Sequence, residues 1–349
     1  MKFYTKQHPY YCGIDLHAKT MYICIVDQAG AILVHQNVTC SSENLHYLIE
    51  PYITDLVIAV ECIFTWYWIA DFCQSNDVSF VLGHALYMKA IHGSKTKNDK
   101  IDSHKIAMLL RGGMLPVAYV YPVRLRSTWD LLRRRMHFVC KRAELLAHIQ
   151  NTKSQYNLPD FQKTISYQRN RKGVVEHFQD ASVQKSISLD LELIKEYDKL
   201  FNEIELYLTQ HAKEHEPQQL FLLQTIPGVG KILGLVILYE IEDINRFERV
   251  QNFCSYARLI KPQKESGGKT KSGGSNRKMG NAYLKWAFGE ATLLMIRERQ
   301  EIKELNAKLK NKYGKARALA IISHKLGRAV YYMLKNKQAF NMIKFVQNV

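Results

Sequence analysis

The chain has 349 residues, of which 47% are hydrophobic and 23% are charged, and this composition excludes a disordered or fibrous protein. Its formal net charge of +17 favours a polyanionic partner, either nucleic acid or an anionic membrane surface. The seven cysteines include no CxxC pair, so the sequence predicts neither a disulfide framework nor a zinc site, and a reducing cytoplasm fits best. A chain of this length usually folds as two or three structural units.

No membrane partner is expected from the apolar segments. The longest one, residues 56–73, carries Glu61 in its middle and Asp71 near its end, and its first residues indicate a strand. Residues 1–15 contain no apolar run long enough for a signal peptide.

The first part of the chain, residues 1–123, is predicted to be an α/β domain. Strand-like stretches at 10–15, 20–27 and 31–38, with a Gln-Ala-Gly turn before the last, indicate a three-strand meander. The following elements are a capped helix at 41–53, a buried strand at 55–61, a helix at 65–75, a strand at 78–84 and a helix at 99–111. A meander followed by alternating helices and strands is the element order of a ribonuclease H-like α/β domain.

The middle part, residues 124–216, is predicted to be mostly helical. The stretches 126–156 and 188–215 carry long apolar stripes with charged opposite faces, as in two arms of an antiparallel coiled coil. The polar, basic residues 166–173 would join the arms, and the pattern favours a helical spacer or dimerisation arm over a catalytic role. The start of the first arm holds three adjacent candidates for phosphate contact, which are Arg133, Arg134 and Arg135.

The last part, residues 217–349, is predicted to be mainly helical. The stretch 227–230, Pro-Gly-Val-Gly, lies between two apolar helical stretches, where glycines permit a tight turn. In a helix-hairpin-helix, the backbone N–H groups after such a turn hold a DNA phosphate, whereas an ordinary helical turn with a glycine cap explains the pattern equally well. The candidate nucleic-acid-binding residues of this turn are Gly228, Gly230 and Lys231. Residues 261–281, rich in Gly, Ser and Lys, are predicted to form a loop that ends at a helix start.

Four acidic residues form a candidate metal site. Asp99 and Asp102 stand three residues apart near a predicted helix start, so they share one helix face, although either one suits an ordinary cap. Asp15 and Glu61 each end a predicted strand, and ligands usually bind at the strand ends of an α/β sheet. Converging carboxylates repel each other unless divalent cations that prefer oxygen ligands, such as Mg²⁺, lie between them. Paired metal ions of this kind polarise phosphodiesters, and the four residues together favour a metal site over separate surface groups.

Five stretches of the sequence resemble the successive motifs of a known family. They are GIDLHAKT (13–20), AVECIFTWYW (59–68), SKTKNDKIDSHKIAMLL (94–110), IPGVGKILG (226–234) and SGGKTKSGGSNRKMGN (266–281). Their order and spacing are similar to those of DEDD-type insertion-sequence transposases of the IS-one-ten class, with its IS-eleven-eleven group and the related Piv-type DNA invertases. The resemblance implies a RuvC-like N-terminal domain, a coiled-coil arm and a C-terminal transposase domain. It also implies a serine nucleophile in the C-terminal domain and a structured RNA that pairs with donor and target DNA.

Carried over to this chain, the resemblance assigns the acidic set to Asp15, Glu61, Asp99 and Asp102 and the nucleophile to Ser266, the serine of the first Ser-Gly-Gly. Ser272, in a second Ser-Gly-Gly, and Ser275 keep other assignments open, and GGSNRKMGN departs from the family's Ile-Ser-Lys before the final Gly-Asn. Glycines let the backbone approach a phosphate, and the positive charge of this segment comes from Lys264, Lys269, Lys271, Arg277 and Lys278. A serine hydroxyl needs a metal ion or a base for activation, which we expect from the acidic cluster and its Mg²⁺.

The sequence thus favours a DNA transposase or recombinase that forms a covalent phosphoserine intermediate. One alternative is a RuvC-like metal-dependent nuclease that cuts DNA by water attack, with the C-terminal domain only gripping the substrate. The other is a nucleic-acid-binding scaffold with a decayed active site, against which the intact acidic set argues. The expected partners are the DNA of the element ends and target, a structured guide RNA, and further copies of the chain in a dimer or tetramer.

Overall fold

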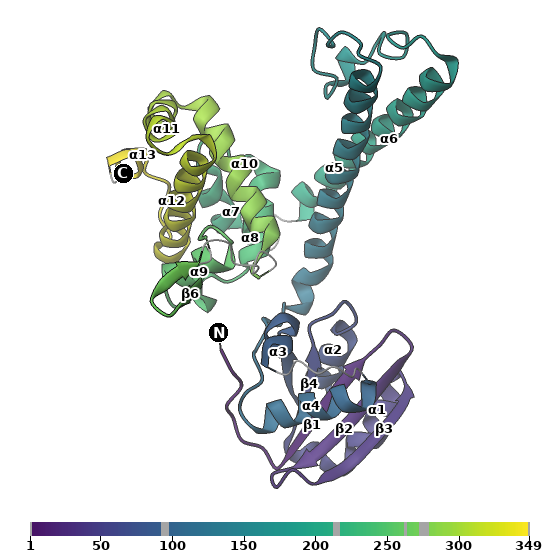
Figure 1. The fold of residues 1–349 in the computed structure, drawn as a ribbon. Helices are drawn as coiled ribbons and strands as arrows, with labels where there is room; N and C mark the ends of the chain where they lie inside the picture. Colours follow the sequence, from purple (N-terminus) through teal and green to yellow (C-terminus); the bar gives the residue numbers. More distant parts are fainter. Residues whose placement is uncertain (1, 92–97, 212–216, 262–263, 272–278, 348–349) are drawn as a thin grey trace. The chain divides into compact units, whose positions relative to one another are not determined.

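The computed structural model describes residues 2–91, 98–211, 217–261, 264–271 and 279–347. Contacts between residues group the chain into two compact units, Met1–Arg124 and Leu125–Val349 (Figure 1). Among the described helices, none is both long enough and apolar enough to cross a membrane.

The first unit is built on a mixed sheet with the strand order β3-β2-β1-β4-β5. Its strands are β1 (Tyr10–Leu16), β2 (Thr20–Asp27), β3 (Ile32–Thr39), β4 (Leu56–Glu61) and β5 (Ser79–Gly83). The first three form an antiparallel meander, while β4 pairs in parallel with both β1 and β5. Consecutive residues of β1 and β4 are buried, as expected for central strands with nearly continuous apolar sequence. The predicted α/β unit that opens with a meander is confirmed.

Helix α4 (Asp99–Arg111) packs against β1 and β2 and closes the core of the first unit. The close approach depends on Gly13 in β1. A Cβ atom at this position would lie 2.3 Å from the backbone nitrogen of Ala107 and 2.3 Å from the backbone oxygen of Ser103. The absence of a side chain at Gly13 therefore sets how closely α4 can approach the strand that carries Asp15.

Replacing Gly13 with alanine is expected to lower the free energy of unfolding by about 3 kcal/mol, because backbone atoms of α4 must move to make room. Denaturant unfolding followed by circular dichroism measures this change. Gly289→Ala in helix α10 (Ala282–Glu298) is the control, since an added Cβ atom there meets nothing within 4 Å. The control is expected to stabilise the protein by up to about 1 kcal/mol. A Gly13→Ala variant with unchanged stability would contradict the close packing of α4 on β1.

The described part of the first unit has three further α-helices and a 3-10 helix, Glu50–Asp55, which follows α1 where the sequence predicted a single helix over 41–53. Helix α1 (Ser42–Ile49) begins at Ser41, whose hydroxyl oxygen accepts the N–H of Asn44 at 3.1 Å, as the capping pattern predicts. Helix α2 (Tyr67–Ser75) lies where a helix is predicted. Helix α3 (Ala85–Ile91) is not predicted from the sequence, because its seven residues are too few for a clear apolar period.

The second unit begins with the two long helices predicted for the middle of the chain, α5 (Val123–Gln155) and α6 (Ala181–His211). One apolar cluster joins them, and its buried members are Ile149, Ile165, Val174, Phe178, Ile187 and Ile194. Several of these residues come from the connection between the helices. The connection, predicted to be polar and basic, therefore also has an apolar interior.

The remainder of the second unit is mainly helical, as predicted. Its other helices are α7 (Pro217–Gln224), α8 (Lys231–Ile241), α9 (Val250–Tyr256), α10, α11 (Gln300–Tyr313), α12 (Lys315–Asn336) and α13 (Met342–Gln347). All residues of α8 from Leu233 to Ile241 are buried, which makes α8 a central helix of this unit.

Within segment 261–281, which is predicted to be a loop, residues 264–271 form a hairpin. Strands β6 (Lys264–Ser266) and β7 (Lys269–Lys271) form an antiparallel hairpin. Gly267 and Gly268 connect the strands with φ angles of +60° and +71°. A two-residue turn with positive φ at both positions favours glycine, so the Gly-Gly pair closes a hairpin where composition alone predicted an irregular loop.

Candidate active site

Two of the predicted carboxylates and a histidine meet at the end of strand β1. Nε2 of His17 lies 3.5 Å from Oδ2 of Asp15 and 3.4 Å from Oδ2 of Asp99. One potential ligand atom from each of the three residues lies within 4.8 Å of the other two. Asp15 reaches this point from β1, and Asp99 reaches it from the first turn of α4. The packing of α4 on β1 therefore brings together carboxylates that are far apart in the sequence.

Asp15 is the more enclosed of the two carboxylates. Its side chain is 17% exposed, whereas that of Asp99 is 52% exposed. Burial raises the pKa of the Asp15 carboxyl; His17 lowers this pKa, and the negative charges of Asp99 and Asp102 raise it again, with a net increase. A raised pKa means that the negative charge of Asp15 is unfavourable in this position unless a cation compensates it.

Asp102, the third predicted carboxylate, lies on the same side of α4 as Asp99, one turn further along the helix. Its Oδ1 is 3.1 Å from Nζ of Lys105, so the carboxylate forms an ion pair within the helix. Its negative charge is a minor contribution to the raised pKa of Asp15, which burial causes in the main.

Glu61, the fourth predicted carboxylate, ends strand β4 beside β1. The last paired residues of the two parallel strands are Ile14 and Val60. Asp15 and Glu61 are the next residues of their strands, so they lie side by side at the same height along the strand direction. Side chains at the same level of adjacent parallel strands lie on the same face of the sheet. The structure therefore places Glu61 on the neighbouring strand, at the end of the sheet where Asp15 lies.

The first turn of α4 is held by two hydrogen bonds. Oδ1 of Asn98, the N-cap, accepts the N–H of Lys100 at 2.9 Å, so neither Asp99 nor Asp102 caps this helix. Nε2 of His35 in β3 donates to the carbonyl oxygen of Lys100 at 2.8 Å. These bonds fix the helix start from which Asp99 extends.

His17 and His35 are the residues of this site that sequence reasoning missed. His17 follows Asp15 by two positions, and residues two apart along an extended strand point to the same face. This spacing was the available signal for His17. No comparable signal exists for His35, because its contact with α4 depends on how the helix packs on the sheet.

The donor atoms of this site fit a hard divalent cation. Asp15 and Asp99 offer carboxylate oxygens at short range, and the raised pKa of Asp15 reflects a charge repulsion that a cation would relieve. A histidine nitrogen is a poorer ligand for Mg²⁺ than a carboxylate oxygen. His17 is therefore better suited to orienting Asp15 and Asp99 than to binding the ion itself.

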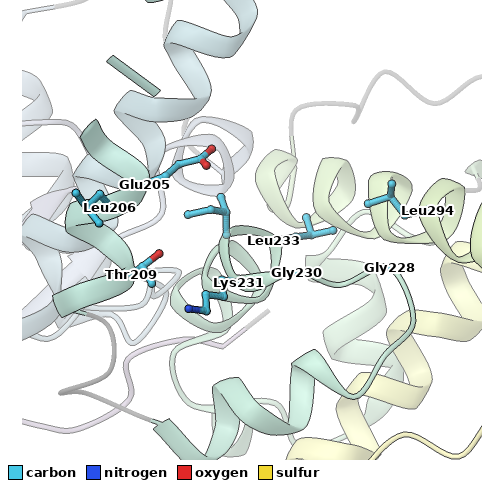
Figure 2. A pocket seen from close by; sticks show the side chains of 9 residues that line it. Glu205, Leu206, Thr209, Gly228, Gly230, Lys231, Leu233 and Leu294 are labelled. Atoms are coloured by element: carbon cyan, nitrogen blue, oxygen red, sulfur yellow. The ribbon is translucent and has the colours of Figure 1, made fainter. Parts of the chain in front are cut away.

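The Pro-Gly-Val-Gly turn borders a pocket of about 590 Å³ in the second unit (Figure 2). Gly228 has a φ of +82°, and a Cβ atom there would lie 2.6 Å from Cβ of Leu294, so packing against α10 already requires glycine. Gly230 is the N-cap of α8, and an added Cβ atom would meet nothing within 4 Å. Glu205 and Lys231 provide charged groups at the pocket wall.

The three adjacent arginines of α5 have different surroundings. Arg133 donates to both carboxylate oxygens of Glu240 at 2.8 and 2.9 Å, and Nε of Arg135 donates to Glu205 at 2.8 Å. Arg134 is exposed, with its guanidinium 4.7 Å from the ring centre of Phe138. Phosphate contact remains a prediction for all three residues, and Arg134 is the one whose guanidinium is exposed.

The predicted nucleophile lies in the hairpin of the second unit. The backbone of Ser266 pairs with that of Lys269 next to the Gly-Gly turn, and Lys264 and Lys271 pair at the other end. The side chains of these four residues lie outside the described part of the structure, as do the residues Ser272, Ser275, Arg277 and Lys278 altogether. The role of Ser266 therefore remains a prediction.

Comparison with known proteins agrees with this architecture. Residues 12–157 match the DEDD transposase domain of the IS110 type, and residues 221–307 match the family described as "Transposase IS116/IS110/IS902 family". The transposase for insertion sequence element IS1111A from Coxiella burnetii (strain RSA 493 / Nine Mile phase I) is 21% identical over 344 residues, which span 94% of this chain and 90% of the relative. A DEDD domain implies the use of a divalent metal ion, and a transposase binds DNA. The chain belongs to the IS116/IS110/IS902 family of transposases, and it is a DNA strand-transfer enzyme with a DEDD domain of ribonuclease H-like fold.

Proposed function

We propose that this transposase cuts and rejoins DNA through a covalent intermediate on Ser266, with Mg²⁺ held by Asp15, Glu61, Asp99 and Asp102. The observation that carries the proposal is the convergence of Asp15 and Asp99, whose ligand atoms lie within 4.8 Å of each other. A bound divalent ion would supply Lewis-acid polarisation of the DNA phosphate and lower the pKa of an attacking hydroxyl. Asp15, which is more enclosed than Asp99 and Asp102, is the ligand we expect to matter most.

The proposed covalent step conserves the number of phosphodiester bonds. Oγ of Ser266 attacks a DNA phosphorus, so that a serine O–P bond forms while the bond from phosphorus to a deoxyribose oxygen breaks. The serine proton passes to a base, and the released deoxyribose oxygen takes up a proton. Rejoining reverses the step with a hydroxyl of the partner strand, so no external energy source is required.

The second unit provides the proposed nucleic-acid contacts. We propose a division into a RuvC-like domain (1–123), a coiled-coil arm (124–216) and a C-terminal domain (217–349). We also propose that the whole protein acts as a dimer or tetramer. The start of α8 after Gly230 would hold a DNA phosphate as in a helix-hairpin-helix. The net charge of +17 suits a protein that binds element DNA, target DNA and a structured guide RNA together.

The test of the proposed function uses a plasmid that carries the gene with its flanking DNA. We expect strand cleavage with Mg²⁺, none after chelation with EDTA, and a protein–DNA adduct that survives denaturation with detergent. Cleavage without any adduct would favour the hydrolytic nuclease. Binding without cleavage at any metal concentration would favour the non-catalytic scaffold.

Arg134→Gln is expected to weaken DNA binding uniformly across sequences and to reduce the slope of log affinity against log salt concentration by about one. Its guanidinium is exposed, so it can replace a counterion at a phosphate. Lys141→Gln is the control on the same helix, because Glu144 already neutralises Lys141 at 2.8 Å. Fluorescence anisotropy at several salt concentrations measures both slopes. Equal slopes for the two variants would argue against phosphate contact by Arg134.

A further inference from the structure

Glu240 in α8 is a buried carboxylate that joins two distant parts of the second unit. Its side chain is 3% exposed. The guanidinium of Arg133 in α5 donates to both of its oxygens, and Nδ2 of Asn281 donates to Oε2 at 2.6 Å. The same guanidinium lies 3.7 Å from the ring centre of Trp129 and 4.4 Å from that of Tyr283. Burial lowers the pKa of Arg133, but the hydrogen bonds and charge of Glu240 outweigh this and raise the pKa.

Asn281 is the last residue of the segment 261–281, which carries the proposed nucleophile. Its backbone N–H donates to the carbonyl oxygen of Tyr256, at the end of α9, at 2.5 Å. Nε of Arg258 donates to the carbonyl oxygen of Gly280 at 2.8 Å. These two hydrogen bonds join the residues just before segment 261–281 to the residues at its end. The two ends of the segment therefore lie next to each other, and we call this place its closing point.

Glu240 connects this closing point to α5, because its carboxylate is hydrogen-bonded to both Asn281 and Arg133. The carboxylate of Glu240 accepts two hydrogen bonds from Arg133 and one from the side-chain amide of Asn281. Because all three bonds must be satisfied at once, the three side chains can adopt few relative arrangements. A shift of α5 along α8 would break the bonds to Arg133 and leave the buried charge of Glu240 with Asn281 as a much weaker partner. The position of α5 and the anchoring of the segment are thus linked through one side chain.

We propose that Arg133, Glu240 and Asn281, here called the α5 latch, are positioning residues that hold the anchored end of segment 261–281 in the orientation required for strand cleavage. The latch makes cleavage depend on how α5 is seated against α8. This inference rests on the proposed function of Ser266 as the nucleophile.

Two conservative variants test the latch. Arg133→Lys keeps the positive charge but loses the planar fork that binds both oxygens of Glu240. Asn281→Ser keeps an oxygen that can cap α10 at the N–H of Leu284, now bonded at 2.9 Å, but loses the amide donor to Glu240.

Matched controls have the same substitutions elsewhere in the second unit. Arg142→Lys lies on the same helix, where Nε of Arg142 donates to Asp198 at 2.6 Å. Asn341→Ser replaces an asparagine whose Oδ1 accepts the N–H of Lys344 at 2.9 Å. Neither control residue contacts the latch among the hydrogen bonds of the described residues.

The experiment uses the full-length protein, Mg²⁺, a plasmid that carries the gene with its flanking DNA, and RNA transcribed from that flanking DNA. It measures the rate of adduct formation, the dissociation constant for DNA and the melting temperature. Each latch variant is expected to form the adduct between about 10 and 100 times more slowly, with a melting temperature close to that of its control, and Asn281→Ser is expected to keep the DNA affinity of its control. The double variant should lose less than the product of the two single losses, because both variants act through Glu240.

The outcomes separate the latch from the proposed nucleophile. An adduct that maps to Ser266 and forms at the control rate in both latch variants overturns the latch alone. An adduct outside segment 261–281, or none in the unchanged protein, overturns the proposed nucleophile and the latch with it. Losses of DNA affinity and melting temperature in proportion to the loss of rate would show a merely structural role and also overturn the latch.

Discussion

An Asp15→Asn variant is expected to cleave DNA about a thousandfold more slowly than the unchanged protein while it still binds DNA. The amide removes a negative charge and a ligand oxygen from the most enclosed position of the acidic cluster. Loss of several kcal/mol of transition-state stabilisation corresponds to a rate decrease of about this size. Single-turnover cleavage of a labelled plasmid, at saturating protein and over a range of Mg²⁺ concentrations, measures the effect.

The same variant has an informative effect on stability. Because burial raises the pKa of Asp15, its negative charge opposes folding near neutral pH in metal-free buffer. The amide is therefore expected to leave the free energy of unfolding unchanged or to raise it. This result would distinguish a residue kept for chemistry from a residue kept for folding.

Asp27→Asn is the matched control for Asp15→Asn. Asp27 also ends a strand of the same sheet, and its Oδ1 accepts the N–H of Ala31 at 2.8 Å, a bond that an amide oxygen can keep. Its cleavage rate is expected to equal that of the unchanged protein. If Asp15→Asn cleaved as fast as Asp27→Asn, the acidic cluster would not be the metal site.

A Ser266→Ala variant is expected to bind DNA and RNA normally but to form no covalent adduct. Without the hydroxyl, no oxygen is available to bond to phosphorus, so the loss is complete rather than partial. Ser266→Cys is expected to retain a trace of adduct, since a thiolate attacks phosphorus but makes the rejoining step slow. Gel electrophoresis of labelled DNA under denaturing conditions measures the adduct.

Ser272→Ala and Ser275→Ala are the controls for the nucleophile, since both serines belong to the same segment. Both variants are expected to form the adduct, at a reduced rate if their hydroxyls contact the phosphate. Peptide mapping of the trapped adduct identifies the attached residue. DNA attached to Ser272 would move the nucleophile by six residues and keep the mechanism, whereas cleavage without an adduct in every variant would favour water as the nucleophile.

The sequence alone predicted the elements that carry the acidic residues. The strand-like stretch at 10–15 and the apolar run before Glu61 are local patterns; Glu61 does end β4, and Asp15 lies one residue before the end of β1. The helix at Asp99–Arg111 was predicted from the acidic residues near its start and the apolar spacing after them, whereas its cap, Asn98, was found only in the structure. Local patterns sufficed here because secondary structure near a cap or within a central strand depends mainly on adjacent residues.

Only the tertiary structure decided which of these groups meet. Asp99 approaches Asp15 because Gly13 lets α4 lie close to β1, and no spacing in the sequence encodes that distance. The partners of Arg133 and Arg135 were likewise hidden, since a run of arginines looks the same whether it faces phosphates or glutamates. Composition predicted a loop at 261–281, but the positive φ angles of Gly267 and Gly268 close a hairpin at residues 264–271. Contacts between distant residues depend on how elements pack, and packing is set by the shapes of all the side chains at an interface rather than by any single pattern along the chain.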